Sequence, residues 1–263
     1  MQRRPFLISY SWATDTRLTY IGHSTLLLEL DGMRILTDPV LGDRVLNIRR
    51  VGAPAPPHVA ERIDVVLVSH AHLDHLDMSS LRRLGNLTQF VVPAGTGHLL
   101  RKAGLPRVME VSPGDEVDLG GVKLSTTHAV HSGFRPPFGP AAVAVGFLIS
   151  GSRRIYFAGD TDLFPGMADL APDLDLALLP VWGWGPRLGP GHMNPERAAR
   201  ALQLLRPALA VPIHWGTFWM MGLGPLWRDR ITAPPRLFEA AARALAPEVQ
   251  VRTVEPGEGP FGL

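Results

Sequence analysis

The chain has 263 residues, a formal net charge of +2 and a hydrophobic content of 46%. These values predict one large domain, spanning 1–263, with enough apolar residues for a core. The arginines are dispersed rather than gathered in a stripe, so we expect no nucleic-acid partner. The sequence contains no cysteine, which excludes disulfides, thiolate metal ligands and a cysteine nucleophile.

Two features of the sequence bear on its location. No apolar run approaches the roughly 18–20 residues of a membrane span, so we expect no transmembrane segment. The first residues, Gln2-Arg3-Arg4-Pro5-Phe6-Leu7, superficially resemble a twin-arginine export signal. The apolar stretch that follows is short and is interrupted by serine and tyrosine, which argues against such a signal. The expected location is therefore the cytoplasm.

Apolar runs with alternating or continuous patterns predict strands, and 3.6-residue patterns predict helices. A helix start is clearest at Asn194-Pro195-Glu196, where a capping residue precedes a proline and an acidic first turn. The mixture of both element types over this length indicates an α/β domain. In chain order, strands are expected at 18–30, 33–38, 63–69, 89–92, 122–127, 142–149, 153–158, 174–179, 208–213 and 249–254, and helices at 77–84, 96–103, 194–205 and 235–246.

The densest cluster of candidate metal ligands is His70-Ala-His72-Leu-Asp74-His75, which directly follows an apolar run. Residues at i and i+2 of an extended segment point the same way, so His70 and His72 can bind one cation together. Asp74 and His75 fall where the chain turns into a predicted helix, so they can face a second cation. This density of imidazole and carboxylate groups indicates a metal site rather than ordinary surface composition.

Three later predicted strands end in residues of the same types. One ends in His128-Ala-Val-His131, which offers two candidate histidines, the next in Gly159-Asp160 and the third in His214. Histidine and aspartate suit a pair of borderline cations such as Zn²⁺, although Mn²⁺, Fe²⁺ or cobalt also fit.

These segments together resemble the metallo-β-lactamase superfamily of metal-dependent hydrolases. The resemblance implies a four-layer αββα sandwich, an α/β fold in which two face-to-face sheets carry helices on their outer sides. It also implies two divalent metal ions in a groove at one edge of the sandwich. The implied ligands are His70, His72 and His131 for the first ion, Asp74, His75 and His214 for the second, and Asp160 as the bridge between them.

Residues 18–255 resemble one branch of that superfamily, which contains the N-acyl-phosphatidylethanolamine phospholipase D-type enzymes and, more distantly, the ascorbate-phosphate lactonases. In the phospholipase-like pattern the third strand ends in Pro-Ala-x-His, which places His131 at the ligand position and His128 at the position of the proline. His128 is then expected to pack below the site as a hydrogen-bonded histidine. The segments that carry this similarity are Tyr20-Ile-Gly-His23-Ser with the following strands to Asp38-Pro39, His192-Met-Asn-Pro195-Glu-Arg-Ala198, and Ile213-His214-Trp215-Gly-Thr-Phe218.

The resemblance implies a hydrolase in which two cations share a water, lower its pKa and make hydroxide available as the nucleophile. We favour phosphodiester or phospholipase D-like chemistry on a small-molecule or lipid-like substrate, with lactone or amide hydrolysis as the alternative. A different class, a non-catalytic metal-binding regulatory protein, is disfavoured by the complete ligand set. The sequence has no Gly-x-Ser-x-Gly motif, so no serine nucleophile is expected.

Three further polar residues are candidates for supporting roles. Asp38 either orients a ligand histidine through its second ring nitrogen or caps a turn. His23 could approach the cations or form a hydrogen bond with Asp38. His192 could bind the substrate or protonate a leaving group. The expected catalytic residues are Asp74, His192 and His23.

Residues around the implied groove suggest how a substrate is bound. Arg44 follows the Asp38-Pro39 turn and is expected to overhang the groove and bind a phosphate. Loops rich in glycine, proline and aromatic residues at 133–140 and 182–191 are expected to form its walls. Trp184 is the expected substrate-binding residue of the second loop.

The segment 215–227 is unusually apolar and has no clear helical period. Its first residue, Trp215, is a second candidate for substrate binding. The segment can line an acyl pocket, form an interface between subunits of a homo-oligomer, or pack under the sheet edge, and the sequence leaves these alternatives open.

Overall fold

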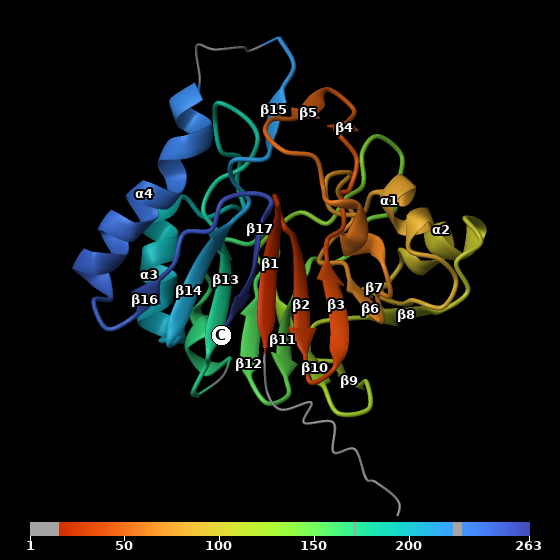
Figure 1. The fold of residues 1–263 in the computed structure, drawn as a ribbon, viewed down its shortest axis with the longest axis horizontal. Helices are drawn as coiled ribbons and strands as arrows, with labels where there is room; N and C mark the ends of the chain where they lie inside the picture. The colour runs from red at the N-terminus through yellow and green to blue at the C-terminus, as the bar shows by residue number, and fades with distance from the viewer. Residues whose placement is uncertain (1–15, 171, 223–227) are drawn as a thin grey trace, which may run out of the picture.

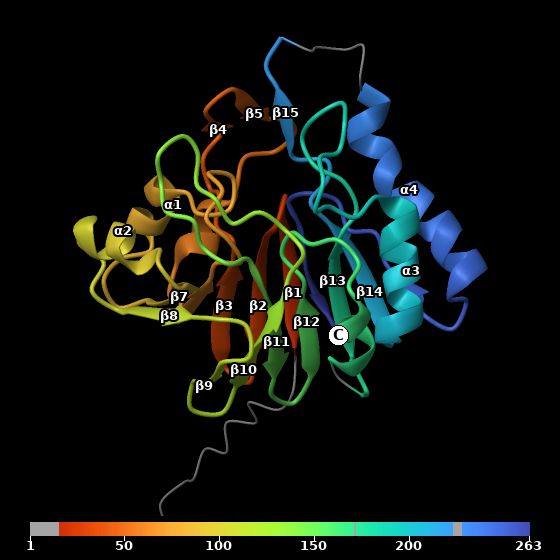
Figure 2. The same ribbon diagram turned by 180° about the vertical axis from the view of Figure 1, so that it is seen from behind.

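The computed structural model describes residues 16–170, 172–222 and 228–263, so the prediction about an export signal lies outside the described residues. Two seven-stranded sheets dominate this part of the chain, and they lie face to face. Helices cover the outer side of each sheet, as Figures 1 and 2 show. This is the four-layer αββα sandwich that the sequence predicted.

The first sheet is built mainly from the N-terminal half of the chain and the second from the C-terminal half. Both sheets combine antiparallel pairs with parallel pairs of strands. In spatial order the first sheet contains β17 (Glu258–Gly262), β1 (Arg17–Gly22), β2 (Thr25–Leu30), β3 (Met33–Thr37), β6 (Val65–Leu67), β7 (Gln89–Pro93) and β8 (Val108–Val111). The second contains β16 (Gln250–Val251), β14 (Leu209–Ile213), β13 (Leu176–Pro180), β12 (Arg154–Phe157), β11 (Val145–Ser150), β10 (Lys123–His128) and β9 (Glu116–Asp118).

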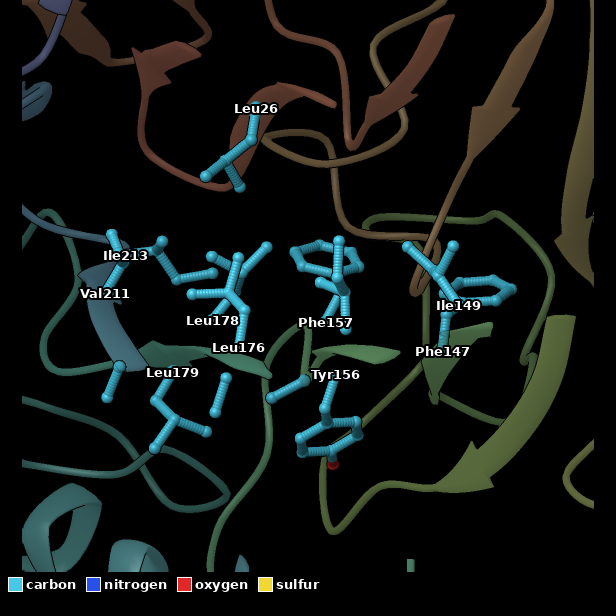
Figure 3. Packing of buried hydrophobic residues seen from close by; sticks show 14 of the residues in the cluster. Leu26, Phe147, Ile149, Tyr156, Phe157, Leu176, Leu178, Leu179, Val211 and Ile213 are labelled. Carbon is cyan, nitrogen blue, oxygen red and sulfur yellow. The ribbon is translucent and has the colours of Figure 1, made fainter. Parts of the chain in front are cut away.

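The core between the sheets follows the two-residue period of the strands. Figure 3 shows Leu176 and Leu178 of β13 pointing toward Leu26 of the facing sheet, whereas Leu179 and Tyr156 point to the opposite side. All five side chains are buried completely. Both faces of the second sheet are therefore apolar, one packing on the other sheet and one on helices.

Four helices flank the sheets in the described residues: α1 (Met78–Arg83), α2 (Gly97–Lys102), α3 (Pro195–Leu205) and α4 (Arg228–Leu245). Leu81 and Leu100 of the first two pack on the outer face of the first sheet, and α3 and α4 pack on the second. Two short 3₁₀ helices, η1 (Pro57–Ala60) and η2 (Pro165–Asp169), lie in connecting segments. None of the helices in the described ranges is long and apolar enough to cross a membrane.

A third sheet of three short strands was not predicted. It consists of β15 (Phe218–Met220), β5 (Ile48–Arg50) and β4 (Arg44–Val45), and it lies at one end of the sandwich, at the top in Figure 1. Strands of two or three residues carry too little periodicity to be recognised in a sequence.

The observed elements differ from the predicted ones mainly at sheet edges and in α4. The edge strands β8, β9 and β17 were missed, and β17 contains two glycines and a proline, which are unusual in strands. Helix α4 begins at Arg228 rather than at residue 235 and continues through Pro234 and Pro235. Both proline rings are buried, so their packing offsets the backbone hydrogen bonds that the missing N–H groups cannot make.

Candidate metal centre

The loop 69–77 joins β6 to α1 and carries four of the predicted ligands. Its end is fixed by Asp77, whose carboxylate accepts hydrogen bonds from the backbone N–H groups of Ser79 and Ser80 at the start of α1. Within the loop, the backbone N–H of His75 donates to the carbonyl of His72 at 3.1 Å. This turn brings His75 back toward the histidines that precede it.

Three ring nitrogens meet at one side of the site. Nδ1 of His72 lies 2.9 Å from Nε2 of His70 and 3.1 Å from Nε2 of His131. The ligand atoms of these three residues all lie within 4.8 Å of one another. His131 follows β10 of the other sheet, so the group joins the two halves of the sandwich. Three convergent imidazoles are a common ligand set for Zn²⁺.

The Asp160 carboxylate lies between this first group and two further histidines. Its Oδ2 atom is 3.2 Å from Nε2 of His214 and 3.3 Å from Nε2 of His75. The same oxygen is 3.9 Å from Nε2 of His70 and 4.0 Å from Nε2 of His131. Asp160 therefore occupies the central position that a bridging ligand requires.

Asp74 and His23 complete a second group. Oδ2 of Asp74 is 3.0 Å from Nε2 of His23 and 3.8 Å from Nε2 of His75. The ligand atoms of His23, Asp74, His75 and His214 lie within 4.8 Å of one another. His23 thus contacts Asp74 rather than Asp38, the partner that was considered from the sequence.

Four of the candidate ligand histidines are held through Nδ1, the ring nitrogen that points away from the centre of the site. Nδ1 of His75 lies 2.7 Å from Oδ2 of Asp38, which is buried and also accepts hydrogen bonds from the backbone N–H and hydroxyl of Ser69. Nδ1 of His214 lies 2.7 Å from the carbonyl of Trp182. Such partners fix the orientation of a ligand histidine and leave Nε2 free for a cation. Of the two readings of Asp38, the structure supports the orienting one. The remaining pairs are His70 Nδ1 with the Ser69 hydroxyl at 2.9 Å, and His131 Nδ1 with the Gly191 carbonyl at 2.8 Å.

Unusual backbone conformations gather at the same place. His23, Asp38 and His214 have φ angles of 57°, 33° and 63°, a region that side chains other than glycine rarely adopt. Gly159 has a φ of 58°, and a Cβ atom there would lie 2.5 Å from Cβ of Ser69. The glycine allows Asp160 to approach the 69–77 loop. Strained residues of this kind cluster at functional sites.

The pKa values of the histidines in the site are shifted in opposite directions. Burial lowers the pKa of His131 to about 4 and that of His23 to about 3. Burial acts in the same direction on His75, but the Asp160 and Asp38 carboxylates outweigh it and raise the pKa of His75 well above its ordinary value. Burial would raise the pKa of Asp160, but the surrounding histidines, His214 first, hold that pKa well below its ordinary value.

The residues present fit a pair of divalent cations. Oδ1 of Asp160 is buried and has no hydrogen-bond partner in the described residues, which is costly for a carboxylate unless a cation binds it. Nitrogen and oxygen donors without sulfur suit Zn²⁺, Mn²⁺ or Fe²⁺. The candidate ligands are His70, His72, Asp74, His75, His131, Asp160 and His214, the set that the sequence predicted.

A pocket of about 500 Å³ opens directly onto these residues. His72, Asp74, Asp160 and His214 form part of its lining, and His192 stands beside them with its Nε2 atom 3.4 Å from Oδ2 of Asp160. Apolar side chains cover much of the rest. They are Val45 and Ile48 from the third sheet, Leu46 from the turn between β4 and β5, Leu73, and Trp184 and Leu188 from the loop after β13; Figure 2 shows that loop beside β15.

The predicted substrate-binding role of Trp215 is wrong. Its side chain is buried in the main core, its indole N–H donates to the carbonyl of Pro212 at 2.9 Å, and its ring packs near Tyr20. The backbone turns sharply at His214, which sends the next side chain into the core. Of the three alternatives for the segment 215–227, its first residue, Trp215, therefore follows the packing alternative. Residues 223–227 lie outside the described residues.

Two other predicted positions also differ. Arg44 is exposed, its Nε–H donates to the carbonyl of Leu46, and it is not part of the pocket lining. His128 does not pack below the site; its side chain is exposed and meets the ring of Phe164 edge to face. The sequence analysis expected the loop 182–191 in the wall but did not single out Arg187, which lines the pocket and makes no hydrogen bond or ion pair with the described residues. No pattern around Arg187 marks it, because it stands in an irregular loop.

Comparisons with known proteins agree with this geometry. Residues 33–215 match the family model of the beta-lactamase superfamily domain. A UPF0173 metal-dependent hydrolase of Aeropyrum pernix is 32% identical, and the match covers 92% of this chain and 96% of that protein. The N-acyl-phosphatidylethanolamine-hydrolyzing phospholipase D 1 of Caenorhabditis elegans is 30% identical over 77% of this chain and 64% of its own length. The chain also spans 60% of the length of the mycobacterial relatives that it matches.

A solved structure supports the same assignment. Igni18, a metallo hydrolase from Ignicoccus hospitalis, is 28% identical, and the superposition has a TM-score of 0.72 over 95% of this chain and 100% of that one. The fold, the family match and the relatives together identify the class. The chain belongs to the metallo-β-lactamase superfamily of metal-dependent hydrolases.

Proposed function

We propose that the protein is a dinuclear metal-dependent hydrolase that acts on phosphodiester or phospholipase D-like substrates. The observation that carries the proposal is an apolar pocket lined by four of the seven convergent histidine and aspartate residues. Two divalent cations held there would lower the pKa of water toward neutrality and polarise the bond under attack.

The chain's own residues supply the other functions that hydrolysis needs. His192 is partly exposed to the pocket and lies beside Asp160. Burial alone would lower the pKa of His192, but the hydrogen bond to Asp160 and its charge raise that pKa above its ordinary value. A histidine in this position can donate a proton to a leaving group. His23, whose pKa is low, stays neutral and holds Asp74.

The pocket favours a substrate with an apolar part and an anionic part. Leu46, Ile48 and Leu188 offer aliphatic contacts, and Arg187 offers the one free guanidinium among the lining residues that the structure describes. A guanidinium recognises phosphate oxygens through its planar pair of donors. The similarity to a phospholipase D of Caenorhabditis elegans favours the same chemistry.

The test is turnover by purified protein loaded with Zn²⁺, Mn²⁺ or Fe²⁺. We expect hydrolysis of bis(4-nitrophenyl) phosphate or of an N-acyl-phosphatidylethanolamine, and loss of this activity on chelation. Hydrolysis of a lactone or an N-acyl amide without phosphodiester turnover would contradict the phosphodiester proposal and favour the alternative within the same family.

We expect Arg187→Ala to raise the KM for an anionic phosphodiester by roughly tenfold, because a partly screened charge-assisted hydrogen bond is lost. The KM for a neutral ester should stay the same. Arg44→Ala is the matched control, since Arg44 is another exposed arginine at this end of the sandwich but is not part of the lining. Equal effects of the two changes on the anionic substrate would contradict the assignment of Arg187.

The two ions should differ in their response to pH. His131 has a pKa of about 4 and is neutral at pH 7, whereas His75 has a pKa well above 6.5 and holds a proton that a cation must displace. Lowering the pH from 7 to 5 should therefore reduce the binding affinity for the second ion about tenfold per pH unit. The affinity for the first ion should stay nearly unchanged. Calorimetric Zn²⁺ titrations at several pH values measure both affinities. A parallel decline of the two would contradict this assignment.

A further inference from the structure

The Asp74 carboxylate is held by two donors that come from distant parts of the chain. The indole N–H of Trp184, in the loop after β13, donates to Oδ2 of Asp74 at 2.9 Å. Nε2 of His23, which follows β1, lies 3.0 Å from the same oxygen. In the described residues the other oxygen of Asp74 has no hydrogen bond.

The third sheet fixes both donors. Its small hydrophobic cluster is formed by Val40, Val45, Ile48 and Phe218, and the ring of Trp184 packs against it. Phe218 also meets His23 edge to face, with ring centroids 5.3 Å apart. The wall of the substrate pocket and the support of Asp74 are therefore one packed unit.

We propose that Trp184 is a positioning residue that holds Asp74 in the orientation needed to bind the second metal ion. The inference rests on the proposed dinuclear centre. The terminal torsion of an aspartate is soft, so an unsupported carboxylate samples a broad range of orientations. A donor on one oxygen removes that freedom before a cation binds, as partners of metal ligands commonly do.

Trp184 is better suited to a test than His23. An indole N–H can only donate a hydrogen bond, so Trp184 cannot itself be a metal ligand. His23 belongs to the group of residues that could hold a cation, and changing it would alter two properties at once. Replacing Trp184 by phenylalanine keeps an aromatic ring against the third sheet and removes the donor to Asp74.

The loop also contains a matched control. Trp182 is partly buried and packs against the main core, and its indole N–H donates to the carbonyl of Gly185 within the loop. Trp182→Phe therefore makes the same chemical change two residues away without touching Asp74. The backbone carbonyl of Trp182 that accepts from His214 is retained in that variant.

The experiment is a Co²⁺ titration of the metal-free full chain, followed by visible absorption and calorimetry, for the unchanged protein and both variants. We expect the unchanged protein and Trp182→Phe to bind two equivalents with the same affinities. In Trp184→Phe the second equivalent should bind about 10- to 100-fold more weakly, with the first unchanged. Circular dichroism and thermal unfolding verify that each variant is folded.

The possible failures are separable. If the unchanged protein binds a single equivalent, the dinuclear proposal fails whatever the variants do. If it binds two and Trp184→Phe binds both equally well, the positioning role of Trp184 is wrong. Equal weakening in Trp182→Phe and Trp184→Phe would also overturn it, because the effect would then belong to loop packing rather than to the bond with Asp74.

Discussion

Asp160→Ala should abolish dinuclear metal binding and reduce hydrolysis by more than about 100-fold. Loss of a residue that only supports a ligand typically costs 10- to 100-fold in metal affinity or activity, and Asp160 lies directly between the two groups of histidines. Without its charge, His75 and His214 would also lose the carboxylate that both ring nitrogens face. Elemental analysis and turnover by the same preparation measure the two effects.

Asp162→Ala is the control for this substitution. Asp162 lies two residues further on, is partly exposed and pairs with Arg197 instead of facing the histidines. We expect it to retain both metals and nearly full activity. Fully active protein that contains at most one tightly bound metal per chain would contradict the dinuclear mechanism.

His131→Ala should lower metal content and activity together, again by more than about 100-fold, whereas His128→Ala should change neither more than about twofold. Nε2 of His131 lies 3.1 Å from the nearest ring nitrogen of the first group. His128 is exposed three residues earlier and contacts only the ring of Phe164 among the aromatic residues described.

The pair is informative because His128 is the last residue of β10 and His131 follows it by only three positions. Metal analysis by mass spectrometry, together with turnover, distinguishes them directly. Metal loss in His128→Ala with retention in His131→Ala would mean that the ligand assignment is displaced by three residues.

The position of the candidate ligands could be predicted because their spacing reflects backbone geometry. An i, i+2 pair such as His70 and His72 points one way in an extended segment, and strand ends bring residues such as Asp160 and His214 to one edge. The assignment of those ligands to a particular ion came from the resemblance to a family rather than from spacing. The structure brings the same residues together.

The walls of the pocket were harder to predict. Val45 and Ile48 belong to strands of two and three residues, which have no readable period, and their packing against Phe218 joins segments far apart in the sequence. Trp215 was a candidate for substrate binding because it begins the unusually apolar segment 215–227. The positive φ of His214 reverses the direction of the chain, and such a reversal cannot be seen in the sequence.

Each of the two groups of histidines combines loops from both sheets, and this has a consequence for the molecule as a whole. His75 and His214 are 139 positions apart in the sequence, yet their Nε2 atoms are 3.2 Å apart. Ions bound between such loops would act as crosslinks that close long stretches of chain and restrict the unfolded ensemble. Metal binding would therefore connect the two sheets, and the same metal–ligand bonds would support both catalysis and resistance to unfolding.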